Sequence, residues 1–383
     1  MDIYEESLEM HEKFRGKLGT YSKVPLNNKK DLSLAYTPGV AEPSRRIGLN
    51  KEEAYKYTNK GNMVAVISNG TAVLGLGDIG AYGAIPVMEG KAILFKELAG
   101  IDAFPICINS KDVQENIRTI RNIAPVFGGI NLEDYRAPEC FEIENALQDL
   151  GIPVMHDDQH GTAMVVLGGM INALRVVGKK KEEVHIVING AGAAGTAIMK
   201  LLLRYGFRHI IMLDSKGAIS SNRNDLNEEK KEIVKLTGNG LDGDLKSILG
   251  GKDIFIGVSK GNLLNEEMVR SMNKDAIVFA LANPAPEIMP DVALKGGAKI
   301  VATGRSDFPN QVNNSLIFPG VFRGALDCRA TRITTEMKLA AAEALAGQVV
   351  NLSKDNILPP ALDKGVVKAV AEAVKKAWRK ENE

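Results

Sequence analysis

The sequence of 383 residues is poor in cysteine and in aromatic residues, and its charges nearly cancel. Its three cysteines, Cys107, Cys140 and Cys328, are too few and too far apart for a disulfide framework or a zinc spacing, which favours a reducing cytoplasm. A formal net charge of +1 gives no reason to expect a nucleic acid or a membrane surface as partner. Residues 1–14 are charged throughout and are therefore not a signal peptide.

The sequence also lacks a long uninterrupted hydrophobic run. Its most apolar helix candidate, residues 163–177, is broken by Gly168, Gly169, Asn172 and Arg175, so we expect a core helix and no membrane span. A hydrophobic content of 45% and a charged content of 25% are ordinary for a soluble globular protein. The length exceeds one ordinary core and predicts two domains.

The first half predicts a small parallel α/β domain. Strand candidates 104–108, 126–134 and 152–155 alternate with helix candidates 112–123 and 138–150. In such sheets, ligands bind at the carboxyl ends of the strands.

Residues 63–74 contain two β-branched runs around Asn69-Gly70 and predict a β-hairpin. The glycines of residues 75–80 match G-x-G-x-x-G, but they follow this hairpin, and Pro86 interrupts what comes after. We therefore expect no dinucleotide at this match.

The second half contains the same fingerprint in the context that it requires. Strand 184–189 runs into Gly190-Ala191-Gly192-Ala193-Ala194-Gly195, then come helix 196–205 and strand 209–213, which ends at Asp214. The glycines permit a tight turn, and the helix N-terminus stabilises a pyrophosphate. Asp214 favours the ribose 2′-hydroxyl of NAD, whereas Lys216 could pair with the 2′-phosphate of NADP, so NAD is expected and NADP stays open.

Further strands at 253–258, 276–281 and 299–306 complete a doubly wound sheet. We predict an α/β protein whose second domain is a Rossmann-type parallel sheet and whose smaller first domain carries catalytic residues. The predicted boundaries are 1–155 and 156–383, with C-terminal helices 334–347 and 364–378 free to pack back on the first domain.

Two pairs of acids follow predicted strands of the first domain, namely Glu133-Asp134 and Asp157-Asp158. Acids at neighbouring strand ends suit Mg²⁺ or Mn²⁺, because hard cations prefer oxygen ligands. His156 and His160 have a zinc-like spacing, but the metalloprotease pattern needs glutamate after the first histidine. Helix capping and surface solvation are the structural alternative for the acids.

Several motifs together resemble malic enzyme, in the right order from about residue 22 to 326. They are residues 34–41 around Tyr36-Thr37-Pro38-Gly39, Gly75-Leu76-Gly77-Asp78, both acid pairs with Gly161-Thr162-Ala163, the dinucleotide turn, and Asn313-Asn314 with Phe318-Pro319-Gly320. The length is similar to the small prokaryotic type.

This resemblance implies oxidative decarboxylation of L-malate to pyruvate and CO₂, with reduction of NAD(P). It implies Tyr36 as the acid that protonates C3, Lys91 as the base that takes the C2 hydroxyl proton, and Asp157 as the neighbour that tunes Lys91. A lysine can be that base only if its pKa is lowered. The remaining implied roles are metal binding by Glu133, Asp134 and Asp158, and substrate contact by Asn283, also assigned to the cofactor site, and Asn313.

One departure concerns the substrate. Larger eukaryotic malic enzymes carry an arginine shortly before the Gly-Leu-Gly motif, and residues 69–73 here contain none. Thr71, Arg305 or the asparagines would have to bind the substrate carboxylate. An amino-acid dehydrogenase and a non-catalytic nucleotide-binding regulator remain as alternatives. The amphipathic N-terminal segment 1–17 predicts a homodimer in which it packs across the two-fold axis.

Overall fold

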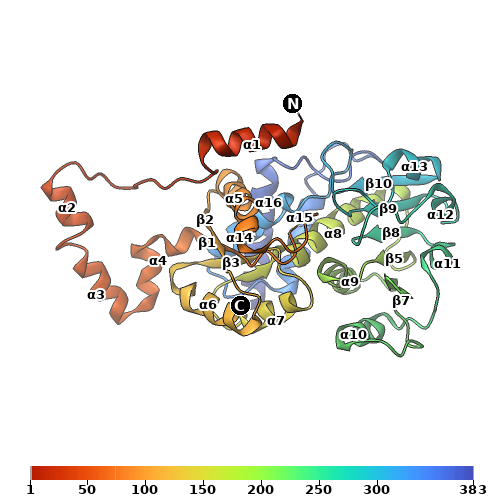
Figure 1. The fold of residues 1–383 in the computed structure, drawn as a ribbon, viewed down its shortest axis with the longest axis horizontal. Coiled ribbons are helices and arrows are strands. Elements are labelled where there is room, and N and C mark those ends of the chain that lie inside the picture. Colours follow the sequence, from red (N-terminus) through yellow and green to blue (C-terminus); the bar gives the residue numbers. More distant parts are fainter. Residues whose placement is uncertain (1, 74, 383) are drawn as a thin grey trace.

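The computed structural model describes residues 2–73 and 75–382 and contains two parallel sheets joined by a long helix (Figure 1). The first sheet has the order β2-β1-β3-β4, and its neighbouring strands pair in parallel. Its strands are β1 (Met63–Ser68), β2 (Asp102–Cys107), β3 (Gly129–Leu132) and β4 (Val154–His156). Helices α5 (Gly80–Ala99), α6 (Val113–Ile123) and α7 (Glu139–Ala146) connect them.

The second sheet has the order β10-β9-β8-β5-β6-β7 and is parallel except for the short edge strand β7. Its strands are β5 (His185–Asn189), β6 (His209–Asp214), β7 (Gly217–Ala218), β8 (Ile254–Gly257), β9 (Ala276–Ala280) and β10 (Ala298–Thr303). Its helices are α9 (Ala193–Tyr205), α10 (Glu228–Thr237), α11 (Leu245–Leu249), α12 (Glu266–Arg270) and α13 (Pro290–Lys295). The predicted α/β class with a Rossmann-type second domain is confirmed. The exact domain boundary stays a prediction.

Strands in both sheets do not alternate between buried apolar and exposed polar residues, because helices cover both faces of each sheet. In β9, every residue is buried, and in β1 only the first is not. Residues of the two domains share one hydrophobic core, which includes Met88 of α5, Met170 of α8 and Phe279 of β9.

Helix α8 (Asp157–Val177) begins directly after β4 and runs between the sheets. It is long and apolar enough to cross a membrane, yet 72% of its apolar window is buried inside the protein. The prediction of a core helix is therefore confirmed.

The C-terminal helices return to the first domain. Helices α14 (Phe318–Asp327) and α16 (Lys364–Asn382) pack on each other and on α5, while α15 (Thr335–Ala346) packs on α8. Phe95 of α5 contacts the rings of Phe318 and Phe322 edge-on, at centroid distances of 4.7 and 5.3 Å.

The predicted β-hairpin over residues 63–74 is wrong, although residue 74 lies outside the described part of the chain. Only its first half is a strand, and β1 pairs in parallel with β2 and β3. Pro86 does not interrupt the following segment, since α5 continues through it to Ala99. The Asn-Gly turn signal is local, whereas burial of β1 in the centre of the sheet decides its partners.

The N-terminal segment forms an extended arm. Helices α1 (Ile3–Phe14), α2 (Lys29–Ala35), α3 (Ala41–Leu49) and α4 (Ala54–Tyr57) contain no buried residue among those described. Figure 1 shows α2 and α3 standing away from the first sheet. We call residues 2–57 the N-terminal arm.

Candidate active site

The centre of the site is a buried lysine between two carboxylates. Lys91, in the middle of α5, places its Nζ 2.6 Å from Oδ2 of Asp157 and 2.8 Å from Oε1 of Glu133. The same ammonium lies 4.3 Å from the centroid of the Phe318 ring. A lysine side chain that is only 10% exposed is seldom a solvated turn residue.

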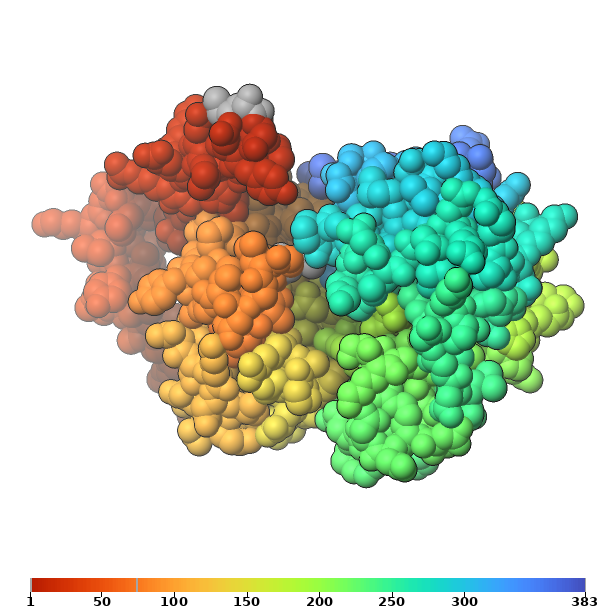
Figure 2. Space-filling view, turned by 45° about the vertical axis from the view of Figure 1, so that its right-hand side comes forward, coloured from red at the N-terminus to blue at the C-terminus, as the bar shows by residue number. Residues whose placement is uncertain are grey.

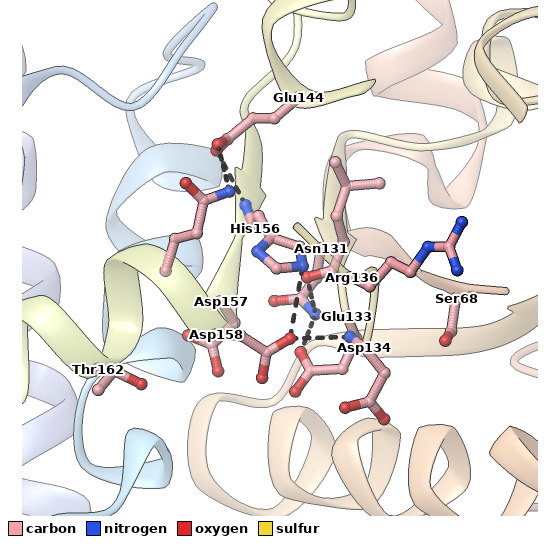
Figure 3. A network of polar contacts seen from close by, with 12 residues as sticks. Ser68, Asn131, Glu133, Asp134, Arg136, Glu144, His156, Asp157, Asp158 and Thr162 are labelled. Atoms are coloured by element: carbon pink, nitrogen blue, oxygen red, sulfur yellow. Dashed lines mark hydrogen bonds and ion pairs between the residues drawn. The ribbon is translucent and has the colours of Figure 1, made fainter. Parts of the chain in front are cut away.

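Three acids converge beside this lysine. Oxygen atoms of Glu133, Asp134 and Asp158 lie within 4.8 Å of one another, and Figure 3 shows their side chains extending into one space. The Asp134 N–H donates to Oδ2 of Asp158 at 2.8 Å, which joins the end of β3 to the start of α8. Asn131 donates to Oε2 of Glu133 at 2.8 Å. The parallel sheet thus brings both acid pairs to one edge.

The charges of this cluster depend on one another. Burial raises the pKa of Glu133 and of Asp157, although Lys91 opposes this effect. For Lys91, burial alone would lower the pKa, but the carboxylates of Asp157 and Glu133 outweigh it and raise the pKa above its usual value. The requirement for a lowered lysine pKa is therefore not met by the protein alone. Lys91 is an ammonium ion in this arrangement.

The position of Asp157 is held from α8 and from the loop before α14. A Cβ at Gly161 would lie 1.9 Å from Oδ1 of Asp157, so a larger residue there would displace the carboxylate. Thr162 donates to Oδ1 of Asn314 at 3.0 Å, and the Asn314 amide approaches the backbone oxygen of Asp157 at 3.5 Å. Asn314 therefore contacts the site, which sequence reasoning had assigned to Asn313.

The two predicted substrate asparagines have mainly local contacts. The Asn313 side chain accepts from the Ser315 N–H at 2.9 Å, and the Asn283 amide approaches the Leu281 oxygen at 3.4 Å. Thr71 and Arg305 are also engaged, since Thr71 donates to Asn69 at 2.6 Å and Arg305 pairs with Asp307 at 2.7 Å.

The dinucleotide turn lies between β5 and α9. Gly190 adopts a φ of 128°, and a Cβ at Gly195 would lie 1.8 Å from the Gly190 oxygen. Ala193 and Ala194 form the first turn of α9, and Gly192 precedes it. This backbone matches a turn that presents N–H groups to a pyrophosphate.

Asp214 ends β6 as predicted, but its carboxylate is already surrounded by donors. Arg223 donates to both of its oxygens at 2.8 and 3.0 Å, Lys230 donates at 2.6 Å, and the Lys216 N–H donates at 2.8 Å. These partners lower the pKa of Asp214 to about 2 against the opposing effect of burial. The Lys216 ammonium pairs instead with Asp225 at 2.6 Å.

The sequence analysis did not single out Arg223 and Lys230 as partners of Asp214. The available signal was two cations shortly after the acidic end of the second Rossmann strand.

Tyr36 does not join the cluster. It ends α2 on the N-terminal arm, and it is 66% exposed. None of the hydrogen bonds described for this chain involves its hydroxyl.

Comparison with known proteins agrees with this geometry. Residues 15–148 match the family model described as malic enzyme, N-terminal domain, and residues 159–378 match malic enzyme, NAD binding domain. The chain therefore belongs to the malic enzyme family, whose members oxidise and decarboxylate malate with NAD or NADP. This decides against an amino-acid dehydrogenase and against a non-catalytic regulator.

Curated relatives extend over nearly the whole chain. The bifunctional malic/malolactic enzyme of Bacillus subtilis is 56% identical, over 98% of this chain and 93% of its own length. An NAD-dependent malic enzyme of Geobacillus stearothermophilus is 52% identical over 98% and 79%, and an NADP-dependent malic enzyme of Halomonas elongata is 46% identical over 97% and 92%. The relatives thus include both cofactor types.

Solved structures of the family have the same fold. The NAD-dependent malic enzyme of Thermotoga maritima superposes with a TM-score of 0.94 at 48% identity, covering 98% of this chain and 99% of that one. The malic enzyme of Pyrococcus horikoshii superposes with a TM-score of 0.95 at 45% identity, covering 100% and 92%. The predicted small prokaryotic type of malic enzyme is confirmed.

Replacing Lys91 with methionine should destabilise the protein. Glu133 and Asp157 would stay buried without their counter-charge, so the free energy of unfolding in a metal chelator should fall by about 3 kcal/mol near neutral pH. Urea unfolding measures this. Lys96→Met, on the same helix but 41% exposed, is the control and should cost less than about 1 kcal/mol.

The loss in Lys91→Met should also shrink as the pH falls. Without Lys91 the pKa values of Glu133 and Asp157 rise further, and protonation then neutralises both acids. Equal losses for Lys91→Met and Lys96→Met at every pH would contradict the described charge balance.

Proposed function

We propose that the chain converts L-malate to pyruvate and CO₂ at the carboxyl edge of its first sheet, with Lys91 as the base at C2. The observation that carries this proposal is the contact of Lys91 with Asp157 and Glu133 next to the three converging acids. We place the reaction in the cytoplasm, in keeping with the three free cysteines.

The acids fit a divalent cation. Glu133 and Asp134 are buried, and with Asp158 they offer three carboxylate oxygens within 4.8 Å, which suits Mg²⁺ or Mn²⁺. Burying such a cluster costs free energy unless a positive charge offsets it, and Lys91 is a single charge. When bound, the ion stabilises the negative charge that develops on the C2 oxygen as CO₂ leaves.

Lys91 would take the proton of the C2 hydroxyl, and a nicotinamide held at the dinucleotide turn would supply the hydride acceptor. The base must be the neutral amine, whereas Lys91 is held as an ammonium by Asp157 and Glu133. Glu133, Asp134 and Asp158 would hold a divalent cation, and with their charge compensated they would attract the Lys91 proton less, which would favour its loss. Asp157, which is fully buried, then remains as the partner that keeps the amine oriented.

Substrate carboxylate binding is assigned to Asn283, Asn313 and Asn314 around the Gly75-Leu76-Gly77 loop. The Pro284 ring, next to Asn283, approaches the position of a Cβ at Gly75 to 3.6 Å, which links the second domain to this loop. These amides can donate without adding charge to a site that already carries four acids.

We propose a homodimer in which Tyr36 serves the active site of the other subunit. Half of the 28 large hydrophobic residues that are exposed in the described chain lie within its first 49 residues, on the N-terminal arm. An exposed apolar surface of this extent marks an interaction site. Tyr36 on this arm would then give its hydroxyl proton to C3 of enolpyruvate in the partner's site.

The cofactor is assigned as NAD, with NADP accepted. Asp214 stands where a ribose hydroxyl binds, but Arg223 and Lys230 neutralise its charge. A ribose hydroxyl that binds Asp214 must displace either Arg223 or Lys230 from its carboxylate. Lys230 is the more exposed of these two side chains. The same lysine is free to pair with a 2′-phosphate once it has left Asp214.

Asp158→Asn should weaken divalent-cation binding by tenfold or more, because it removes one charged ligand of the three. Titration of Mn²⁺ by calorimetry measures the affinity. The melting temperature in chelator should stay near that of the wild type, since Asp158 is only partly buried. Asp307→Asn, at an exposed acid, is the control. Full activity in excess chelator would remove the metal from the proposal.

Mixing two inactive variants should restore activity if Tyr36 acts across the dimer. Tyr36→Phe lacks the acid and Lys91→Ala lacks the base, and a mixed dimer contains one site with both groups intact. With random subunit exchange, half of the dimers are mixed, so pyruvate formation should return to about a quarter of the wild-type rate. No recovery after verified subunit exchange would place Tyr36 in its own chain's site.

Lys230→Gln should lower the ratio of kcat/KM for NADP over NAD by about tenfold, because a charge-assisted hydrogen bond to the 2′-phosphate is lost. Lys216→Gln is the matched control, since this lysine pairs with Asp225 and is 67% exposed. If Lys216→Gln removes NADP use and Lys230→Gln does not, then Lys216 and not Lys230 contacts the phosphate.

A further inference from the structure

A second cavity lies on the side of α8 that faces away from the acids that would bind the metal. Its volume is about 660 Å³, it is open to solvent on one side, and it is lined by residues of α7, α9, α10, α15 and the first turn of α8. Figure 2 shows a hollow between the yellow segment that contains α7 and the green segment that contains α10. Neither Lys91, nor the three acids, nor the dinucleotide glycines line it. The volume is in the range of sites for small metabolites.

The wall of this cavity contains a lysine without a direct partner. The side chain of Lys338, on α15, makes no hydrogen bond or ion pair with any residue that the structure describes, although this lysine is partly buried. Burial lowers its pKa even though Glu144 attracts the ammonium. The other two cations of the wall are satisfied, since Lys200 pairs with Glu232 at 3.0 Å and Arg204 with Glu336 at 2.7 Å.

Glu144 cannot serve Lys338 fully because α8 already occupies it. Its carboxylate accepts from the His156 N–H at 3.0 Å (the bond drawn in Figure 3) and from the Gln159 amide at 3.2 Å, and it lies 3.0 Å from Nε2 of His160. Two hydroxyl groups, those of Thr196 and Thr335, also line the cavity. An acceptor-rich anion would find one unpaired ammonium and two donors there.

We propose that this cavity binds a small carboxylate or phosphate anion through Lys338. The bound anion pairs with the Lys338 ammonium, which Glu144 does not contact directly. Thr196 and Thr335 donate to the remaining oxygens of the anion. The site is a binding site only, with no group placed for covalent chemistry.

The same contacts connect the cavity to the first turn of α8. Glu144 contacts His156, Gln159 and His160 through its carboxylate. Asp157 and Asp158 lie between these residues in the chain. An anion bound to Lys338 weakens the electrostatic attraction between Lys338 and Glu144. The hydrogen bonds of Glu144 to the first turn of α8 then change in strength. This coupling rests on the proposed function of Asp157 and Asp158, whereas the binding site does not.

Calorimetric titration tests the binding directly, with inorganic phosphate and glutarate as separate probes and a chelator present. The wild type should bind at least one probe saturably, and the probe that binds identifies the anion class. Lys338→Gln should raise its dissociation constant at least tenfold. Lys180→Gln, at a lysine that is 75% exposed and paired with Glu183, is the control and should leave the constant unchanged.

Thr335→Glu provides a second variant, at an exposed position in the first turn of α15. A glutamate at the first position of α15 suits the helix N-terminus, and its carboxylate would occupy the cavity beside Lys338. It should abolish probe binding while the melting temperature is retained. Absence of saturable binding to the wild type, or equal binding by the wild type and Lys338→Gln, overturns the proposed site.

Kinetics then test the coupling separately. The saturating probe should change KM for malate at least threefold with kcat little altered, and this effect should vanish in Lys338→Gln. Probe binding without any change in KM would overturn the coupling but leave the site. An enzyme inactive on malate that still binds the probe through Lys338 would overturn the proposed function and leave the site in place.

Discussion

The active site depends on the balance between one buried ammonium and the buried carboxylates around it. Glu133 and Asp157 come from different strand ends, and Lys91 from a helix, and none of the three could be buried alone at an acceptable cost. The lysine therefore fixes where β3, β4 and α5 meet. If Lys91 is the base and a divalent cation binds beside it, as proposed, the proton affinity of Lys91 and the affinity for the cation are coupled, because both positive charges compensate the same carboxylates.

Glycine and asparagine around this cluster maintain its geometry. Gly161 leaves the space that Oδ1 of Asp157 occupies, and Asn314 ties the first turn of α8 to the loop before α14. The site is thus built where the two sheets meet, with Lys91 and Glu133 from the first sheet and its helices, Asp157 from α8, and a supporting contact from Asn314. A change in how the two domains pack would therefore shift the side chains of Asp157 and Asp158.

Much of this arrangement could be predicted from the sequence because parallel sheets gather strand ends at one edge. Glu133, Asp134 and Asp158 followed from that rule, and Asp214 from the Rossmann spacing. Asp157 was expected beside Lys91 only from the family resemblance, and Glu133 was not expected as its partner at all. Lys91 is 42 and 66 residues from Glu133 and Asp157, and its place in a helix has no local signal. Tertiary contacts explain both the wrong hairpin and the missed Arg223. In the first case, pairing of β1 with β2 outweighed the local turn signal, and in the second, Asp214 orders the polar segment that contains Arg223.

The return of α14 and α16 to the first domain has a consequence for synthesis of the chain. Phe95 of α5 is covered by Phe318 and Phe322, which leave the ribosome more than two hundred residues later. Helix α5 can pack on β1 and β2 early, but until then its face around Phe95 has no cover, so the first domain cannot complete its core during translation. The domain made first is therefore finished last, and its unfinished surface is the part of the nascent chain that most needs a chaperone.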